Sequence, residues 1–186
     1  MKPLTKAMIS SIPLLLFATV FGSTAQRTTR AAVQPTKDRQ AAPSFRLANA
    51  SGKLAQLADF RGKPVLLNLW ATECGGCRAE LPTFIQLDKT YKDKGLVVIG
   101  VSMDIMYENL KGAEEGWARV KPFVKARGME YQILMDDGAV EKGFKVNALP
   151  ATYLIDRRGR IAATYIGVVD PANLEGNIKK IMSERR

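Results

Sequence analysis

The sequence predicts one α/β domain in which helices flank a mixed β-sheet, and three observations support this fold class. An apolar run at 65–70, broken only by Asn68, has the length of a central buried strand. Strands and helices then alternate along the chain. Finally, the pattern at 151–167 is that of a hairpin, which adds antiparallel strands to the sheet. About 140 residues from position 43 onward are enough for a single core.

Each element follows from its local pattern. Alternating apolar and polar residues predict exposed strands, continuous apolar runs predict buried strands, and apolar residues three or four apart predict helices. Asp170 and Pro171 are a typical helix cap and first helical residue. The expected order is a hairpin at 45–57, a strand at 65–70, helix 78–92, strand 96–101, helix 115–126, strand 131–135, helix 138–144, hairpin 151–167 and a helix from Pro171.

The N-terminal residues 1–25 have the pattern of a secretory signal. Lys2 and Lys6 form a basic start, residues 7–22 are uncharged and mostly apolar, and small residues precede a cleavage site after Ala25. The segment is either cleaved there or kept as a membrane anchor. In both cases the functional part lies outside the cytoplasm, in the periplasm or an equivalent compartment.

Residues 26–42 are polar, rich in Gln, Thr, Ala and basic residues, and without periodicity. This composition predicts a flexible linker before a domain at 43–186. The net charge is +10, but the basic residues are spread along the chain. Without a concentrated basic face or a recognition motif, a nucleic-acid partner is not expected. Solvated surface charge explains the excess, with weak attraction to an anionic membrane as the alternative.

The only two cysteines are Cys74 and Cys77, which follow the strand at 65–70. A helix N-terminus favours the thiolate form, and positions three apart share a helix face. Cys74 is therefore expected to attack and Cys77 to resolve. Zinc is not expected, because the chain has no histidine and no second cysteine pair. A purely structural disulfide closing so small a ring would add little stability.

This pattern resembles the thioredoxin superfamily, in particular its secreted TlpA-like and ResA-like thiol-disulfide oxidoreductases. The resemblance spans 43–182 and rests on three segments: Ala42-Pro43-Ser44-Phe45 with Gly62-Lys63-Pro64-Val65; Trp70-Ala71-Thr72-x-Cys74-x-x-Cys77-x-x-Glu80-x-Pro82; and Ala148 to Asp156 with Gly159. It implies a thioredoxin-like fold with an N-terminal hairpin extension and a central insertion at 104–147.

The resemblance also implies roles for residues beside the cysteines. Leu149 and Pro150 would form a cis peptide loop that presents backbone to an extended substrate strand. Glu80 would act as the base for Cys77, although a first-turn acid is also favoured by the helix dipole alone. Trp70 is expected beside the disulfide, in contact with substrate or as packing.

The sequence departs from the family beside the nucleophile. Glu73 stands where the family usually has Trp, and it either disfavours the thiolate of Cys74 or points to solvent and selects basic partners. Gly76 replaces the usual residue of the intervening dipeptide and loosens the helix start. Asn68 occupies the position of a buried, proton-moving Asp in thioredoxin itself, so that role is unavailable there.

The leading functional hypothesis is a monomeric protein-disulfide reductase that uses the Cys74/Cys77 dithiol and no other cofactor or metal. The resemblance implies secreted disulfide-containing clients, with apocytochrome c as one candidate, and a membrane thiol-transport protein as electron donor. An oxidant or isomerase, a peptide-binding module and a peroxiredoxin are the alternatives. A peroxiredoxin would carry Thr three residues before its reactive cysteine, where this chain has Ala71.

Overall fold

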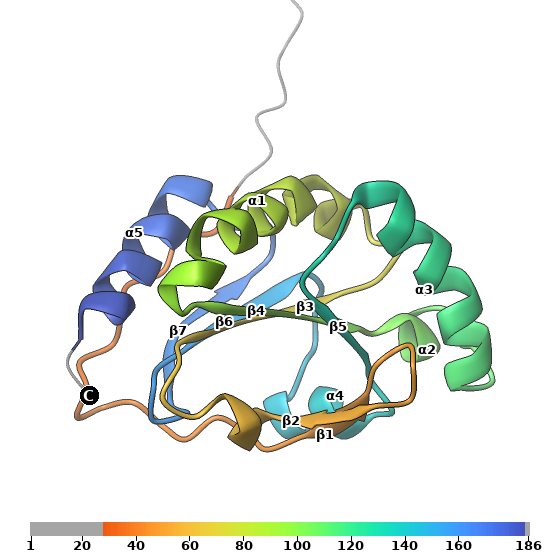
Figure 1. Cartoon of the computed structure of the whole chain (residues 1–186), viewed down its shortest axis with the longest axis horizontal. Helices are drawn as coiled ribbons and strands as arrows, with labels where there is room; N and C mark the ends of the chain where they lie inside the picture. The colour runs from red at the N-terminus through yellow and green to blue at the C-terminus, as the bar shows by residue number, and fades with distance from the viewer. Residues whose placement is uncertain (1–27, 185–186) are drawn as a thin grey trace, which may run out of the picture.

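The structure is a computed structural model that describes residues 28–184, so the signal predicted at 1–25 lies outside the described residues. Helices α1, α3 and α5 cover one face of the main sheet, and the hairpin β1–β2 lies with α4 over the other (Figure 1). The strands are β1 (Arg46–Ala48), β2 (Leu54–Gln56), β3 (Val65–Trp70), β4 (Val97–Ser102), β5 (Gln132–Met135), β6 (Ala151–Ile155) and β7 (Ile161–Ile166). The α-helices are α1 (Gly75–Tyr91), α2 (Asp104–Tyr107), α3 (Ala113–Arg127), α4 (Ala139–Phe144) and α5 (Pro171–Ser183).

The five-stranded sheet has the order β5-β4-β3-β6-β7, and its strand directions are mixed as the sequence predicts. The central strand β3 pairs parallel with β4 and antiparallel with β6. Every residue of β3 is buried. Leu66 and Trp70 join the core under the helices, whereas Val65, Leu67 and Leu69 join the core under the hairpin. Packing on both faces therefore fixes the end of β3, from which the cysteine loop departs.

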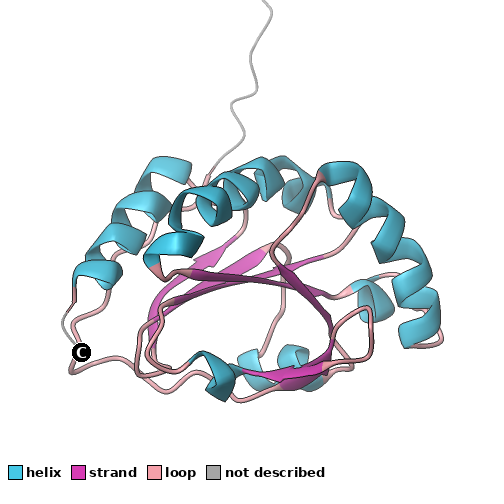
Figure 2. Ribbon diagram, viewed as in Figure 1, coloured by secondary structure: helices cyan, strands magenta, loops and turns pink. Residues whose placement is uncertain are grey.

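The segment predicted as a central insertion folds as α2, α3, β5 and α4. Strand β5 extends the sheet by pairing parallel with β4, and Figure 2 shows the resulting layers of helix and strand. The short helix α2 has too few residues for a periodic pattern and is missing from the sequence prediction. The predicted C-terminal hairpin is present as β6–β7. The side chain of Asp170 caps α5 by accepting the N–H of Asn173 at 2.9 Å.

The structure differs from the expected linker at 26–42, because residues 28–42 lie bonded along the domain, beside α5 and the β6–β7 hairpin (Figure 1). The N–H of Gln34 donates to the carbonyl of Ala162 at 2.8 Å, and the N–H of Ala42 donates to that of Gly159 at 2.9 Å. The composition of the segment does not predict this order, because its backbone groups make the hydrogen bonds and their partners lie elsewhere in the domain.

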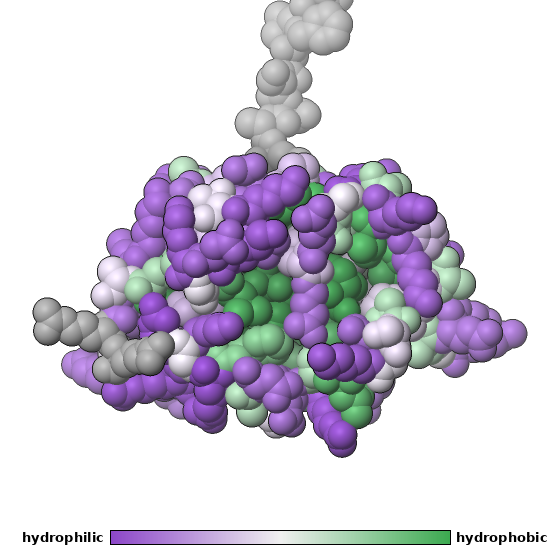
Figure 3. Space-filling view, in the orientation of Figure 1, coloured by the Kyte–Doolittle hydropathy of each residue, from purple (hydrophilic) through white to green (hydrophobic). Residues whose placement is uncertain are grey.

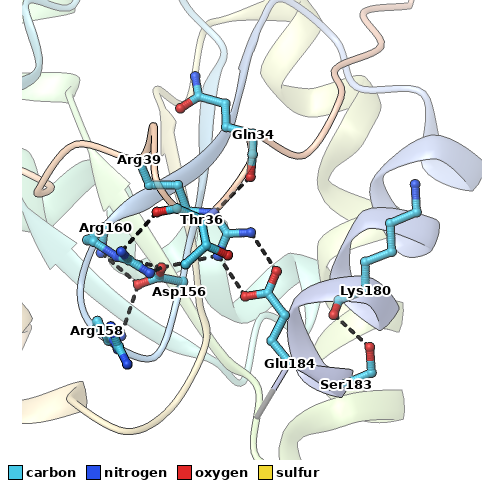
Figure 4. Close-up of polar contacts among 9 residues, drawn as sticks. All are labelled: Gln34, Thr36, Arg39, Asp156, Arg158, Arg160, Lys180, Ser183 and Glu184. Carbon is cyan, nitrogen blue, oxygen red and sulfur yellow. Dashed lines mark hydrogen bonds and ion pairs between the residues drawn. The ribbon is translucent and has the colours of Figure 1, made fainter. Parts of the chain in front are cut away.

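A buried arginine holds this segment in place (Figure 4). The guanidinium of Arg39 is 1% exposed and lies 3.2 Å from a carboxylate oxygen of Asp156, at the end of β6. It also pairs with Glu184, just beyond α5, and donates to the carbonyl of Gln34 at 3.0 Å. One side chain thus joins three parts of the fold, and the ordered domain begins well before residue 43.

The surface view shows hydrophilic side chains over most of one face, with hydrophobic ones gathered between the helical layer and the hairpin layer (Figure 3). Within residues 28–184, no helix combines the length and apolar character needed to cross a membrane.

Replacing Arg39 should weaken the fold much more than replacing an exposed arginine of the same segment. Arg39→Ala removes one guanidinium partner from the buried carboxylate of Asp156, and loss of such a pair costs about 3 kcal/mol. Arg30→Ala removes a 3.7 Å pair with Asp170 in which Arg30 is 70% exposed, so it should cost less than about 1 kcal/mol. Guanidinium unfolding of both variants measures the difference, and equal losses would contradict the role given to Arg39.

Candidate active site

The cysteine pair lies at the junction between β3 and α1. The chain leaves the sheet at Trp70, turns, and begins the helix with Cys74 as its N-cap. The N–H of Cys77 points at the sulfur of Cys74, with 3.2 Å between nitrogen and Sγ. The two cysteines are joined as a disulfide. The first turn of the helix therefore holds a backbone donor beside the atom that would carry the thiolate charge.

Exposure distinguishes the two sulfur-bearing residues. Cys74 keeps 4% of its surface accessible, whereas Cys77 keeps none. A partner disulfide can approach only an accessible sulfur, so this difference favours Cys74 as the attacking group and Cys77 as the resolving one. The assignment agrees with the order expected from the helix N-terminus.

Two loops pack against the cysteine pair. The Leu149–Pro150 peptide is cis, as the resemblance implies. A Cβ atom at Gly76 would lie 3.2 Å from both Pro150 Cδ and Val168 Cγ2. The loops before β6 and after β7 thus close on the same point between the cysteines. The absence of a side chain at position 76 makes this close approach feasible, a reason that sequence reading had missed.

Glu80 lies one turn after Cys77 on the same helix and is 2% exposed. Its Oε1 accepts a hydrogen bond from Asn68 Nδ2 at 2.7 Å, and its Oε2 accepts the N–H of Val169 at 3.1 Å. Burial raises the pKa of Glu80 from 4.5 to about 7, against the opposing effect of these two hydrogen bonds. A carboxyl group with this pKa can both take up and return a proton near neutral pH.

Asn68 has a positioning role. It is fully buried on β3, and its amide nitrogen also donates to Thr152 Oγ1 at 3.1 Å on the neighbouring strand β6. Unlike an Asp, this side chain cannot exchange a proton in the reaction. It orients the carboxylate of Glu80, which carries the titratable group instead.

Of the two expected roles of Trp70, the structure favours packing. It is fully buried and stacks on Phe123 of α3, with 5.4 Å between ring centroids. Gly100 on β4 leaves room for it, because a Cβ there would lie 2.8 Å from Trp70 Nε1. Trp70 therefore supports the cysteine loop from inside the domain.

Glu73 points outward and lies between two arginines. Its carboxylate is 3.9 Å from Arg78 and 3.7 Å from Arg119, and its side chain is 57% exposed. Arg119 also pairs with Glu108 at 3.3 Å. Of the two alternatives for Glu73, the structure favours the solvent-facing one, in which neighbouring arginines offset its charge.

Sequence reading missed an acidic residue that fixes the turn before Cys74. Asp104 is fully buried, and its Oδ1 accepts the hydroxyl of Thr72 at 2.5 Å and the N–H of Thr72 at 3.1 Å. The hydroxyl of Ser102 donates to the other carboxylate oxygen at 2.7 Å. The available signal was an acid directly after a buried strand, since strand ends in α/β sheets often carry site residues.

A groove of about 280 Å³ adjoins the Leu149–Pro150 loop. Its apolar walls include Met103, Met106 and Tyr107 from the region of α2, and Leu149 from the loop. Met106 and Tyr107 are 46% and 52% exposed, which is unusual for large apolar side chains. Across residues 28–184, no three His, Cys, Asp or Glu side chains gather as a metal site would require.

The fold and this arrangement define a thioredoxin-like protein with one cysteine pair at a helix N-terminus. The model of the AhpC/TSA family matches residues 39–164. The thioredoxin-like protein YneN of Bacillus subtilis is 34% identical over 139 residues, which are 75% of this chain and 77% of YneN. The thiol-disulfide oxidoreductase ResA of Bacillus thuringiensis is 35% identical over 141 residues, covering 75% of this chain and 76% of ResA.

Solved structures agree with these relatives. A crystal structure from Chlorobium tepidum, assigned as the thiol:disulfide interchange protein DsbE, superposes with a TM-score of 0.67 and 28% identity. The match covers 78% of this chain and 97% of the other. The chain belongs to the AhpC/TSA family and is one of its thiol-disulfide oxidoreductases.

The buried carboxyl group of Glu80 should make stability depend on pH. Because its pKa is raised by folding, its contribution to stability is complete below about pH 4.5 and is lost as the pH rises through about 7. Relative to oxidised Glu80→Gln, the oxidised wild type should lose about 3 kcal/mol between pH 4.5 and 8. Guanidinium unfolding across this range tests the slope, and parallel curves for the two proteins would contradict it.

Proposed function

We propose that this chain is an extracytoplasmic reductant that breaks disulfides in client proteins through Cys74 and Cys77. The observation that carries the proposal is the stack of an accessible Cys74, a buried Cys77 and a buried Glu80 along one helix. The first supplies a nucleophile, the second a resolving thiol and the third a base with a pKa of about 7.

The reaction begins with the reduced dithiol. The thiolate of Cys74 attacks one sulfur of a client disulfide, a Cys74–client bond forms, and the other client sulfur leaves as a thiolate that takes a proton from water. The carboxylate of Glu80 then removes the proton of Cys77. The resulting thiolate attacks Cys74 Sγ, the Cys74–Cys77 bond forms, and the second client sulfur leaves. Two electrons pass from the protein dithiol to the client, so no further cofactor is required.

Client binding is supported by the groove beside the cis-proline loop. The Leu149 backbone would pair with an extended client strand, placing its disulfide over Cys74. Met106 and Tyr107 would accept apolar side chains flanking the client cysteine. Met is suited to this task because its flexible thioether adapts to different shapes.

The proposal includes a compartment, an electron donor and a candidate client. The signal pattern at 1–25 supports a location outside the cytoplasm, and the similarity to ResA and DsbE supports a role beside other secreted proteins. A membrane thiol-transport protein would restore the dithiol, and apocytochrome c is one candidate client. We expect the protein to act as a monomer, with the signal either cleaved or kept as a tether.

The family match makes a thiol peroxidase the second candidate. Ala71 stands where a peroxiredoxin carries Thr, and the hydroxyl of the following Thr72 is already bonded to Asp104. The reductase is therefore favoured, and peroxide consumption by the dithiol, measured beside insulin reduction, compares the two directly. Faster turnover of peroxide than of insulin would favour the thiol peroxidase over the reductase.

The Cys77→Ser variant should trap clients. Without the resolving thiol, the bond between Cys74 and the client persists, and steady-state insulin reduction should stop. Non-reducing electrophoresis of extracytoplasmic proteins should show adducts that dithiothreitol releases. Cys74→Ser is the matched control and should form none. Equal adducts in both variants would argue that Cys74 is not the attacking group.

The reduction potential should identify the direction of transfer. For a reductant, equilibrium against glutathione should give a value near that of thioredoxin, about −270 mV. Alkylation followed by mass spectrometry measures the oxidised fraction. A value near that of the strong oxidant DsbA, about −120 mV, would instead assign the protein to disulfide formation.

A further inference from the structure

Thr29, in the N-terminal segment 28–42, is hydrogen-bonded to the chain at the end of β7 and in the loop that follows, beside the cysteine pair. The N–H of Thr29 donates to the carbonyl of Val168 at 2.6 Å, and its hydroxyl donates to the carbonyl of Ile166 at 2.7 Å. Its own carbonyl accepts the N–H of Asp170 at 2.9 Å. Two of these hydrogen bonds hold the loop 167–170, which connects β7 to α5, and the third holds the end of β7 from which the loop departs.

The loop at 167–170 forms one wall of the site. Val168 approaches Gly76 between the two cysteines, as the 3.2 Å distance to a Cβ there shows. The N–H of the next residue, Val169, is one of the two donors to the carboxylate of Glu80. Whatever fixes this loop therefore fixes both the contact at Gly76 and the hydrogen bond to the base.

The contacts that follow Thr29 show that the segment is anchored along its length. The N–H of Ala31 donates to Asn173 Oδ1 at 2.9 Å, and its carbonyl accepts Asn177 Nδ2 at 2.8 Å. Ala31 and Val33 pack against the core cluster that contains both cysteines. Arg39 then secures the far end of the segment.

We propose that Thr29 is a positioning residue for the thiol-disulfide reaction, acting through the Val168–Val169 loop on Glu80. The inference rests on the proposed function, because it assigns Glu80 the role of base for Cys77. In this view the N-terminal segment is a working part of the redox site, although none of its residues takes part in the chemistry.

The effect follows from the hydrogen bond to Glu80. If the loop is released, the N–H of Val169 moves away from the carboxylate, which then loses one of its two donors. The pKa of Glu80 should rise further, so less of the base is ionised at neutral pH and deprotonation of Cys77 slows. The other titratable groups facing Glu80 are Cys77 on its own helix and Tyr131 before β5, whose pKa is raised by burial.

The experiment separates attack from resolution with 5,5′-dithiobis(2-nitrobenzoate) as the probe. Attack by Cys74 on this disulfide releases one equivalent of thionitrobenzoate and leaves the other on Cys74. Resolution by Cys77 forms the Cys74–Cys77 bond and releases the second equivalent. The two phases of absorbance are recorded between pH 5 and 9 on the full chain.

Thr29→Pro removes both the N–H and the hydroxyl donor. It should slow the second phase at pH 7 by about threefold, because the loss of one hydrogen bond lowers the ionised fraction of Glu80 from about one half to about one sixth. The pH midpoint of that phase should move upward, and the first phase should stay near its wild-type rate. Thr29→Ser keeps both donors and should behave as the wild type. Thr28→Pro, the same change at the neighbouring exposed residue, is the matched control.

A double variant tests whether the effect passes through the base. In a Glu80→Gln background, Thr29→Pro should cause no further slowing, whereas a general loss of structure would slow both backgrounds. If Thr29→Pro does not fold, Thr29→Val replaces it. This variant keeps the backbone bonds and loses only the hydroxyl donor to Ile166, so a smaller slowing is expected in the wild-type background and none in Glu80→Gln. Second phases equal to that of the wild type in the folded variant overturn the proposal.

Failure of the proposed function would look different. The wild type would then release one equivalent, whatever residue stands at position 29. In that case the hydrogen exchange of the Val169 amide decides the structural part of the inference. Faster exchange in Thr29→Pro than in Thr28→Pro supports it, and equal exchange overturns it.

Discussion

The pair of hydrogen bonds that holds the buried carboxyl group of Glu80 is the constraint on which the rest of the site depends. One donor comes from Asn68 on the central strand, and the other is the backbone of Val169 just before α5. A carboxyl group removed from water needs such donors, and their supply requires strand, helix and loop to meet at one place. The same burial raises the pKa toward neutrality. The same contacts therefore determine both the packing around Glu80 and the pKa of its carboxyl group.

The cysteine loop is held from two further sides. Asp104 fixes the turn through Thr72, and Pro150 closes over Gly76 from the opposite side. Each of these contacts joins segments far apart in sequence, so the loop is supported by tertiary structure. Of the two cysteines, Cys74 alone keeps some accessible surface, 4%. Such rigid support is what a reaction between precisely oriented sulfur atoms requires.

Much of this could be predicted from the sequence, because the main signals are local. Hydrophobic periodicity gave β3 and α1, and the cap formed by Asp170 gave the start of α5. The position of the two cysteines identified the reacting pair. The resemblance to a known family supplied Glu80 and the cis bond before Pro150, which no local pattern of this chain could provide.

What could not be predicted depends on partners distant in the chain. The hydrogen bonds of Thr29 to Ile166 and of Arg39 to Asp156 join residues more than 115 positions apart, and no pattern in the polar segment 26–42 predicts them. For Asp104 the sequence offers only its place after a buried strand, and its contact with Thr72 is visible only in the structure. The sequence left two roles open for Trp70, because an aromatic residue before the cysteines gives the same pattern whether it faces solvent or the core. Its complete burial favours the packing role.

The course of the N-terminal segment limits what can be fused ahead of it. Because Thr29 lies against the loop whose Val168 approaches Gly76, the described part of the chain begins next to one wall of the cysteine site. By the same geometry, an affinity tag fused ahead of this point would crowd incoming clients.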